Sequence, residues 1–426
     1  MIQDASGIVS GVKRKGRENM KVITGGVTAA KDFEAAGVEA AIKYQNRKDM
    51  AMIYSRRPCI LAGTFTSNVV KAAPVLWDQK IVEESPFGQA VIVNAGIANA
   101  CTGKEGMEYC SRTAKKATKV LNVPEDAVLV ASTGVIGMQL PIDRIEAGVE
   151  ALAGLKADTG EAGTQAAEAI MTTDTRSKQA AAEIEIGKVK VRIGGMSKGS
   201  GMIHPNMCTM LAFVTTDAVI SKELLTKAVK ADVEDTFNMI SVDGDTSTND
   251  TLLVMANGAA ENPEIKDGTP EYEDFCRALH YVNETLAKMM AGDGEGATAL
   301  LETKVVGAAS KQDAKRLAKA VISSSLVKAM VYGHDANSGR ILCALGYSGV
   351  SFDPERIQVF LKGEDGKVPI YLDGKVITDS EEEASVLIAK PEVYVLVDMK
   401  MGEETATAWG CDLTHEYVNI NADYRS

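Results

Sequence analysis

Two short apolar runs, residues 89–94 and 127–131, limit the folds open to this chain most strongly. Each has the length of a β-strand and lacks polar alternation, which is typical of strands covered on both faces. We expect each run to end in a polar or glycine-rich turn, at Asn94-Ala95-Gly96 and at Ser132-Thr133-Gly134. Segments with helical spacing, residues 108–121 and 143–153, alternate with these runs. Hydrophobic residues make up 45% of the chain but aromatic residues only 5%, so small and β-branched side chains must fill the core. These features predict a layered α/β fold.

Local signals predict several further elements. A two-residue turn at Gly187-Lys188 joins two runs of alternating apolar residues, which indicates a β-hairpin over residues 184–193. Ser310 and Asp313 have the spacing of a capping pair that opens a helix. With 426 residues, the chain has room for two or three domains, and we place a smaller α+β lobe at residues 300–400. The other expected elements are a strand at 211–216 and helices at 161–170, 221–240 and 272–291.

Charge and composition exclude several classes of protein. The net charge of −12 and the absence of a basic stripe argue against a nucleic-acid partner. No apolar run reaches membrane-spanning length, and Met1–Ala5 does not begin a signal peptide. The seven cysteines and four histidines are scattered, which predicts a reduced cytoplasmic protein without a metal site.

The segment from Gly195 to Leu211 is neither helical in spacing nor alternating. It is rich in glycine and methionine but carries little charge, whereas a surface loop would be more polar. We therefore expect buried, irregular backbone here. Such backbone is uncommon because its polar groups need partners, and it is often functional.

Thr209 lies in this segment and is a candidate nucleophile. If the peptide bond after Cys208 breaks, the new α-amino group of Thr209 can serve as the base that its hydroxyl needs. A free α-amino group has a pKa of about 7.7–8, so it can be neutral at working pH. The competing interpretation is that Thr209 only starts a strand, and composition alone favours that interpretation.

Other turns carry groups suited to acyl transfer. In Ser132-Thr133-Gly134, an exposed N–H and the threonine hydroxyl could bind an oxyanion, although an ordinary turn is the simpler interpretation. Glu295 follows the predicted helix at 272–291 and could meet a ligand ammonium. Lys198 stands among glycines and could pair with a carboxylate, or be a solvated loop lysine. Cys208 is a second candidate nucleophile without an identifiable base, and a small buried residue is the favoured interpretation.

Taken together, these segments resemble the ornithine acetyltransferases, also called bifunctional glutamate N-acetyltransferases. The resemblance extends over nearly the whole chain, and so many ordered matches are more specific than any single motif. The matching segments are Phe65–Asn68, Lys71–Pro74, Ala98–Gly103, Ser132–Gly137, Met171–Thr175, Lys198–Leu211, Asp293–Thr298 and Asn419–Ser426.

The resemblance implies a layered α/β sandwich of the N-terminal-nucleophile type, in which the two products of self-cleavage stay assembled. Residues 1–208 would form the first chain and residues 209–426 the second. Within the second chain, residues 209–299 would complete the sandwich, 300–400 would form the smaller lobe, and 401–426 would return to the active site. At least two copies of each chain would assemble.

The same resemblance implies transfer of acetyl from N-acetylornithine to glutamate through an acetyl-Thr209 intermediate. It implies no bound cofactor and no metal, and it leaves open whether acetyl-CoA is a co-substrate. By match of position, Thr133 and Gly134 would form the oxyanion hole. The implied substrate-binding residues are Thr172, Lys198, Thr209, Glu295, Asn421 and Ser426.

Five positions depart from the family pattern, and they put the fine substrate preference in doubt without removing a proposed catalytic group. They are Ile97, Arg176, Cys208, Ala299 and Ser338. Two alternatives stay open. One is an N-terminal-nucleophile amidase or aminopeptidase that uses water as acceptor. The other is a catalytically silent homologue that binds metabolites.

Overall fold

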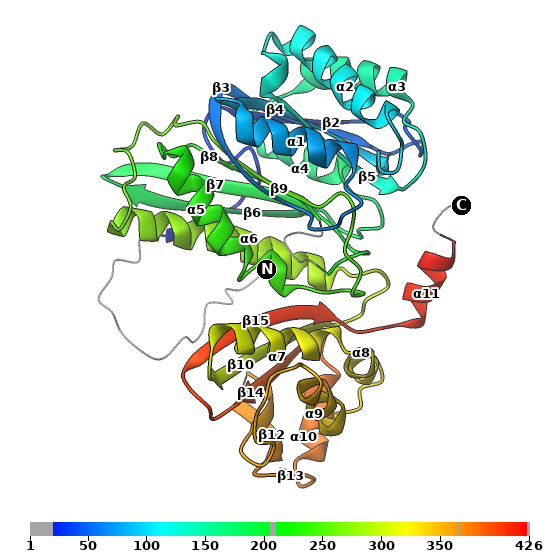
Figure 1. Ribbon diagram of the computed structural model, residues 1–426, viewed down its shortest axis with the longest axis vertical. Coiled ribbons are helices and arrows are strands. Elements are labelled where there is room, and N and C mark those ends of the chain that lie inside the picture. The colour runs from blue at the N-terminus through cyan, green and yellow to red at the C-terminus, as the bar shows by residue number, and fades with distance from the viewer. Residues whose placement is uncertain (1–19, 205–209, 365, 424–426) are drawn as a thin grey trace.

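The computed structural model describes residues 20–204, 210–364 and 366–423. Within these residues, the main body is a sheet of nine strands. They are β1 (Met20–Ile23), β2 (Phe33–Val38), β3 (Met50–Phe65), β4 (Gly88–Ile97), β5 (Val128–Val135), β6 (Lys178–Ile186), β7 (Val189–Lys198), β8 (Leu211–Thr216) and β9 (Thr251–Ala256). Their order is β1-β6-β7-β8-β9-β3-β4-β5, with β2 paired to β3 off this path (Figure 1).

The long strand β3 joins two halves of this sheet. Its first part, from Met50 to Tyr54, pairs with β2 and β4, whereas its second part, from Ile60 to Phe65, pairs with β9. The register with β4 shifts between these two parts. The two halves face each other across one shared core, in which β4 and β5 side chains meet side chains of β8 and β9.

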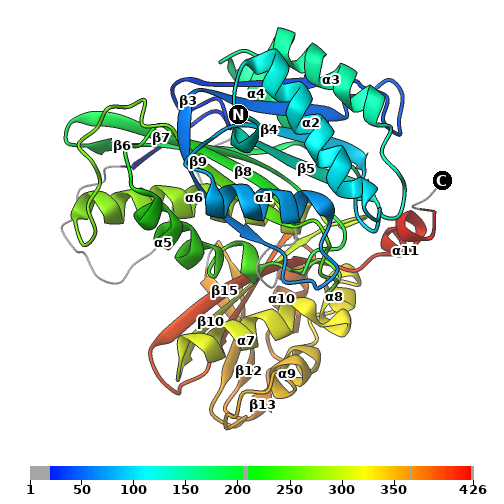
Figure 2. The ribbon, with the colours of Figure 1, turned by 45° about the horizontal axis from the view of Figure 1, so that its top comes forward.

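Helices cover the outer faces of both halves (Figure 2). Helices α2 (Glu105–Leu121) and α3 (Ile142–Leu155) pack on the β2, β4 and β5 half, and α5 (Lys222–Val233) and α6 (Pro270–Gly292) pack on the other. Along β4, Val91 belongs to the inner core and Ile92 to the outer one. Both faces are therefore buried, which confirms the layered α/β fold.

Two more helices lie close to the sheet. Helix α1 (Ala73–Glu84) packs on β5, and its Trp77 indole donates to the carbonyl of Val128 at 3.0 Å. Helix α4 (Gly160–Ala169) packs on β2 and β3 with buried alanines. Small side chains allow this close approach of helix and sheet.

A second sheet of six strands forms the smaller lobe, in the order β13-β12-β11-β14-β10-β15. Its strands are β10 (Leu300–Ala308), β11 (Gln358–Gly363), β12 (Gly366–Leu372), β13 (Lys375–Val376), β14 (Glu392–Asp398) and β15 (Glu404–Cys411). Its helices are α7 (Lys311–Ser323), α8 (Ser325–Tyr332), α9 (Ser338–Gly346) and α10 (Glu381–Ile388). The predicted lobe ended at residue 400. The sheet continues beyond that edge to β15, because β15 pairs with β10.

The lobe is attached to the main body where α6 packs on β15 and β10. The indole of Trp409 in β15 donates to Glu302 at 2.8 Å, and Lys288 of α6 forms an ion pair with the same carboxylate at 2.9 Å. After β15 the chain turns back along the main body as α11 (His415–Ala422). No helix in the described part of the chain is long and apolar enough to cross a lipid bilayer.

Several local predictions are confirmed. The hairpin pairs Ile186 with Val189 across the Gly187-Lys188 turn, and β8 occupies the predicted residues 211–216. Helix α6 spans the predicted 272–291, and the hydroxyl of Ser310 accepts from the N–H of Asp313 at 3.1 Å to cap α7.

Other boundaries were predicted wrongly. Ser132-Thr133-Gly134 and Asn94-Ala95-Gly96 are not turns, because β4 and β5 stay paired in parallel as far as Gly96 and Gly134. The helix predicted at 221–240 ends at Val233, and Thr236 then donates its hydroxyl to the Asp232 carbonyl at 2.9 Å.

The glycine- and methionine-rich segment is only partly irregular. Residues Gly195 to Lys198 belong to β7, and non-repetitive backbone begins at Gly199. The prediction of burial is confirmed from Gly195 to Ser200.

The close approach of α4 to β2 gives a test of the packing. A Cβ at Gly37 would overlap the backbone carbonyl of Gln165 in α4. We expect Gly37→Ala to lower the free energy of unfolding by about 1–3 kcal/mol, because backbone atoms cannot rotate away. Thermal or denaturant unfolding measures this effect.

Gly154→Ala is the matched control, since Gly154 lies in α3 and a Cβ there meets open space. This substitution should leave stability unchanged or raise it by about 0.5–1 kcal/mol. Equal effects of the two substitutions would contradict the packing of α4 on β2.

Candidate active site

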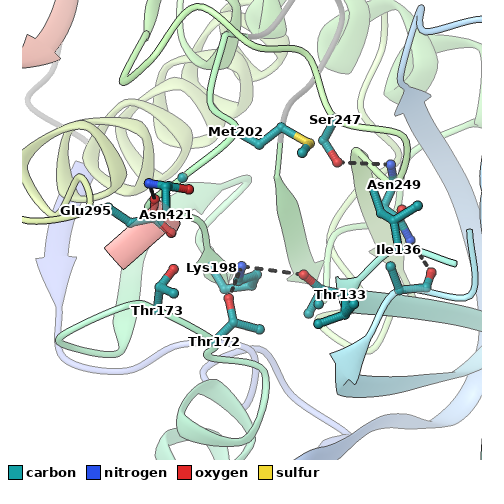
Figure 3. A pocket seen from close by; sticks show the side chains of 14 residues that line it. Thr133, Ile136, Thr172, Thr173, Lys198, Met202, Ser247, Asn249, Glu295 and Asn421 are labelled. Carbon is teal, nitrogen blue, oxygen red and sulfur yellow. Dashed lines mark hydrogen bonds between the residues drawn. The ribbon is translucent and has the colours of Figure 1, made fainter. Parts of the chain in front are cut away.

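A pocket of about 290 Å³ opens where the ends of β5 and β7 meet the loop after α4. The C-terminal helix α11 contributes to its wall through Asn421. Figure 3 shows polar side chains converging on this space from several elements. The lining residues used below are Thr133, Gly134, Thr172, Lys198, Asn249, Glu295 and Asn421.

The end of β5 supplies Thr133 and Gly134 to the pocket. Gly134 has a φ of 127°, and a Cβ there would overlap the backbone of Gly96 in β4. Glycine is therefore required at position 134, because only glycine combines this φ with so close an approach of two strands.

Asn249 fastens these strand ends, although sequence reasoning did not single it out. Its side-chain amide donates to the carbonyl of Ala98 at 2.5 Å and to that of Ser132 at 2.8 Å. The backbone that precedes Thr133 is thus held from the other half of the sheet. The polar run Ser247-Thr248-Asn249-Asp250 before β9 is the sequence signal that could have found it.

Lys198 is the last residue of β7 and lies almost entirely below the surface, with 9% of its side chain exposed. Its ammonium donates to the hydroxyl of Thr172 at 2.7 Å and, over 3.4 Å, to that of Thr133. The carboxylate of Asp174 lies 3.7 Å away. The carboxylate beside Lys198 in the structure is therefore that of Asp174, and its pairing with a ligand carboxylate stays a prediction.

Asp174 connects this lysine to a second buried ion pair. Its carboxylate accepts from the ammonium of Lys178 at 2.7 Å, and Lys178 also donates to Asp293 at 2.6 Å. The side chains of Lys178 and Asp174 are both fully buried. Burial opposes ionisation of Asp174, but the charges of Lys198 and Lys178 outweigh it and hold the pKa of Asp174 below its usual value.

Glu295 lies on the opposite side of the pocket, just after α6 ends at Gly292. Its backbone N–H donates to the carbonyl of Ser200 at 2.8 Å, and its carboxylate accepts from the Asn421 amide at 2.7 Å. A Cβ at Gly201 would overlap this carboxylate, so glycine leaves the space that Glu295 occupies.

A second buried acid, Asp250, borders the same region near Met210 and Leu211. Burial raises the pKa of Asp250 well above its ordinary value, although hydrogen bonds from Ser247, Thr66 and the Met210 backbone oppose this. Sequence reasoning did not identify it.

Six residues predicted from separate motifs line this one pocket: Thr133, Gly134, Thr172, Lys198, Glu295 and Asn421. Cys208, Thr209 and Ser426 lie outside the described residues. Among the residues that the structure describes, Ile97, Arg176, Ala299 and Ser338 are not part of the pocket lining. The described part of the chain contains no group of three or more His, Cys, Asp or Glu side chains that could hold a metal ion.

The chain is similar to known proteins over nearly its whole length. It is 50% identical over 402 residues to the arginine biosynthesis bifunctional protein ArgJ 1 of Clostridium acetobutylicum, covering 94% of this chain and 97% of the relative. It is also 50% identical over 409 residues to the arginine biosynthesis bifunctional protein ArgJ of Symbiobacterium thermophilum, covering 96% of this chain and 100% of that relative.

Solved structures also resemble parts of the chain. One is the arginine biosynthesis bifunctional protein ArgJ of Bacillus halodurans, with 45% identity over 49% of this chain and 97% of that chain, and a TM-score of 0.47. Another is the ornithine acetyltransferase of Mycobacterium tuberculosis complexed with ornithine, with 39% identity over 44% of this chain and 98% of that chain, and a TM-score of 0.41.

The family model for ArgJ matches residues 34–426, which include every pocket residue described above. Together with the two relatives at 50% identity, this match shows that the chain belongs to the ArgJ family.

Proposed function

We propose that this chain is a glutamate N-acetyltransferase of arginine biosynthesis that moves an acetyl group from N-acetylornithine to glutamate. Its relatives are named arginine biosynthesis bifunctional proteins. The observation that supports the proposal most directly is the pocket, which joins two oxyanion-binding candidates, a cation and an anion. The oxyanion-binding groups suit the acetyl carbonyl, and the two charges suit the charged ends of amino-acid substrates.

In the proposed reaction, the hydroxyl oxygen of Thr209 attacks the acetyl carbonyl of N-acetylornithine. The α-amino group of Thr209 takes the hydroxyl proton and passes it to the leaving amine as the carbon–nitrogen bond breaks. Thr133 and Gly134 stabilise the negative oxygen that forms. The amine of glutamate then attacks the acetyl ester, and the Thr209 oxygen recovers its proton as N-acetylglutamate leaves.

The same hydroxyl is proposed to release the catalytic amino group. Attack of Thr209 on the carbonyl of Cys208 replaces the peptide bond with an ester, and water then hydrolyses that ester. Residues 1–208 and 209–426 become separate chains that stay assembled, in two or more copies each. Asn421 and Glu295, which are joined by a hydrogen bond, both belong to the second chain.

The charges of the pocket fit the two substrates. Both carry an α-carboxylate, which can accept from the Thr172 hydroxyl beside the positive charge of Lys198. Ornithine ends in an ammonium that Glu295 can bind, whereas glutamate ends in a second carboxylate. Asn421 and Ser426 complete the proposed binding groups. No bound cofactor is needed for these steps.

The six cysteines in the described part of the chain are free thiols. Free thiols are the usual state in a reducing compartment, so the proposal places the enzyme in the cytoplasm.

The fate of the acetyl group tests the proposed function. With N-acetylornithine and glutamate, we expect purified, cleaved protein to form N-acetylglutamate and ornithine in equal amounts. Release of free acetate would instead indicate an amidase, and an uncleaved 45.2 kDa chain without either product would indicate a silent homologue. Replacing N-acetylornithine with acetyl-CoA in this assay tests the second donor.

Thr209→Ala should abolish both self-cleavage and acetyl transfer, because one hydroxyl serves both reactions. A denaturing gel and the acetyl-transfer assay measure the two effects. Cys208→Ala is the control and should process and react normally, since that side chain lies on the leaving side of the cut. Full activity of Thr209→Ala would rule out this nucleophile.

Glu295→Gln should weaken the binding of N-acetylornithine more than the binding of glutamate. The ornithine ammonium loses a charge-assisted hydrogen bond of about 1.5–3 kcal/mol, which corresponds to a rise in KM of about tenfold to a hundredfold. Glutamate loses a repulsion instead. The glutamine oxygen can still accept from Asn421, so the wall of the pocket is retained.

The KM of each substrate is measured with fully cleaved Glu295→Gln enzyme. Glu302→Gln is a matched control, because Glu302 is partly buried and ion-paired but lies outside the pocket, in β10. Its KM values should equal those of the wild type. An equal or larger loss for glutamate in Glu295→Gln would show that Glu295 does not bind the far end of the substrate.

A further inference from the structure

Asp174 lies in the loop after α4 and forms hydrogen bonds with two separate segments of the chain. Besides the bond from Lys178, its carboxylate accepts from the backbone N–H of Gly199 at 2.7 Å and from that of Thr172 at 3.0 Å. One buried carboxylate thus ties the loop after α4 to the start of the irregular segment after β7. Lys198 directly precedes Gly199 in the chain, and its ammonium donates to the hydroxyl of Thr172.

The ammonium of Lys198 has three protons and three acceptors around it: Thr172, Thr133 and Asp174, at 2.7, 3.4 and 3.7 Å. An ammonium has no lone pair and can only donate, so both threonine hydroxyl oxygens must act as acceptors toward it. Each hydroxyl proton is therefore directed away from Lys198. Both threonines line the pocket, as Figure 3 shows, so their protons are available to a ligand there.

These contacts fix the position of the Lys198 ammonium. A lysine side chain has several freely rotating bonds, and holding it in one rotamer costs conformational entropy. Asp174 provides the fixed charge that offsets this cost, because its own two oxygens are held by Lys178 and by two backbone N–H groups. Lys178 is in turn held by Asp293, two residues before Glu295.

We propose that Asp174 is a positioning residue that fixes the Lys198 ammonium between Thr172 and Thr133, so that the Thr133 hydroxyl donates into the pocket. This inference rests on the proposed function, in which Thr133 binds the oxyanion. Asp174 acts through Lys198 and touches no substrate. Thr133 is thereby prepared as a donor before the acetyl group arrives, and the lysine charge makes it a stronger one.

A double-mutant cycle tests whether Asp174 acts through Lys198. The four proteins are the wild type, Asp174→Asn, Lys198→Met and the double variant, and the measurement is kcat/KM for acetyl transfer. We expect Asp174→Asn to reduce kcat/KM at least tenfold, with Lys198→Met reducing it at least as much. The double variant should match Lys198→Met within about threefold, because no ammonium remains to be positioned.

Asp174→Asn alone leaves two buried lysines with one carboxylate, and that imbalance can prevent folding. The comparison of Lys198→Met with the double variant avoids this problem, since the double variant removes one charge of each sign. Thermal unfolding and the extent of self-cleavage on a denaturing gel are recorded for each. Long incubations with mass-spectrometric detection of N-acetylglutamate measure the slow variants.

Asp217→Asn is the matched control. Asp217 is a buried carboxylate that accepts from the backbone N–H groups of Lys31 and Arg192 at 2.9 and 2.8 Å, next to the end of β8 remote from the pocket. Asp217→Asn should lower the melting temperature but should not lower kcat/KM more than about threefold.

The proposal is overturned if folded, cleaved Asp174→Asn keeps kcat/KM within about tenfold of the wild type. It is also overturned if adding Asp174→Asn to Lys198→Met lowers kcat/KM by more than about threefold. Failure of the proposed function has a different signature, because the wild type itself would then form no N-acetylglutamate.

Discussion

The pairing of β3 with strands on both sides is the constraint on which the active site depends. Its first part pairs with β4, which is followed in the sheet by β5. Its second part pairs with β9, which is followed by β8 and β7. Because β3 joins two facing half-sheets, the end of β5 and the end of β7 come together although they lie in different halves. The result is the 3.4 Å contact between Lys198 and Thr133, two residues 65 positions apart.

Polar groups stabilise the junction of these halves, where apolar packing alone would not fix side-chain positions. Asn249 donates to the carbonyls of Ala98 and Ser132, and Asp174 accepts from the backbone N–H groups of Thr172 and Gly199. The cation and anion charges of Lys178, Lys198, Asp174 and Asp293 balance. Breaking one buried pair would leave an uncompensated charge, whereas the intact set holds the pocket in one arrangement.

The sequence correctly predicted the features that depend on residues close together in the chain. The hairpin turn at Gly187-Lys188, the Ser310 cap and the length of α6 are local signals, and each is confirmed. The ends of β4 and β5 were missed because their polar residues looked like turns, and only pairing with another strand keeps them extended. Asn249 was missed for the same reason, since its partners lie 151 and 117 positions away.

The C-terminal helix α11 gives the pocket a feature that the motifs did not suggest. Asn421 already donates to Glu295 in the structure, so the carboxylate that is proposed to bind the ornithine ammonium has a protein partner. A carboxylate can accept several hydrogen bonds through its two oxygens, so an ammonium can bind without displacing the amide. Glutamate brings an acceptor instead of a donor, and the Asn421 amide, which also donates to the Tyr417 carbonyl at 3.0 Å, is the donor that the proposed function assigns to it. One asparagine can therefore serve both substrates, by orienting Glu295 for the first and by replacing it as partner for the second.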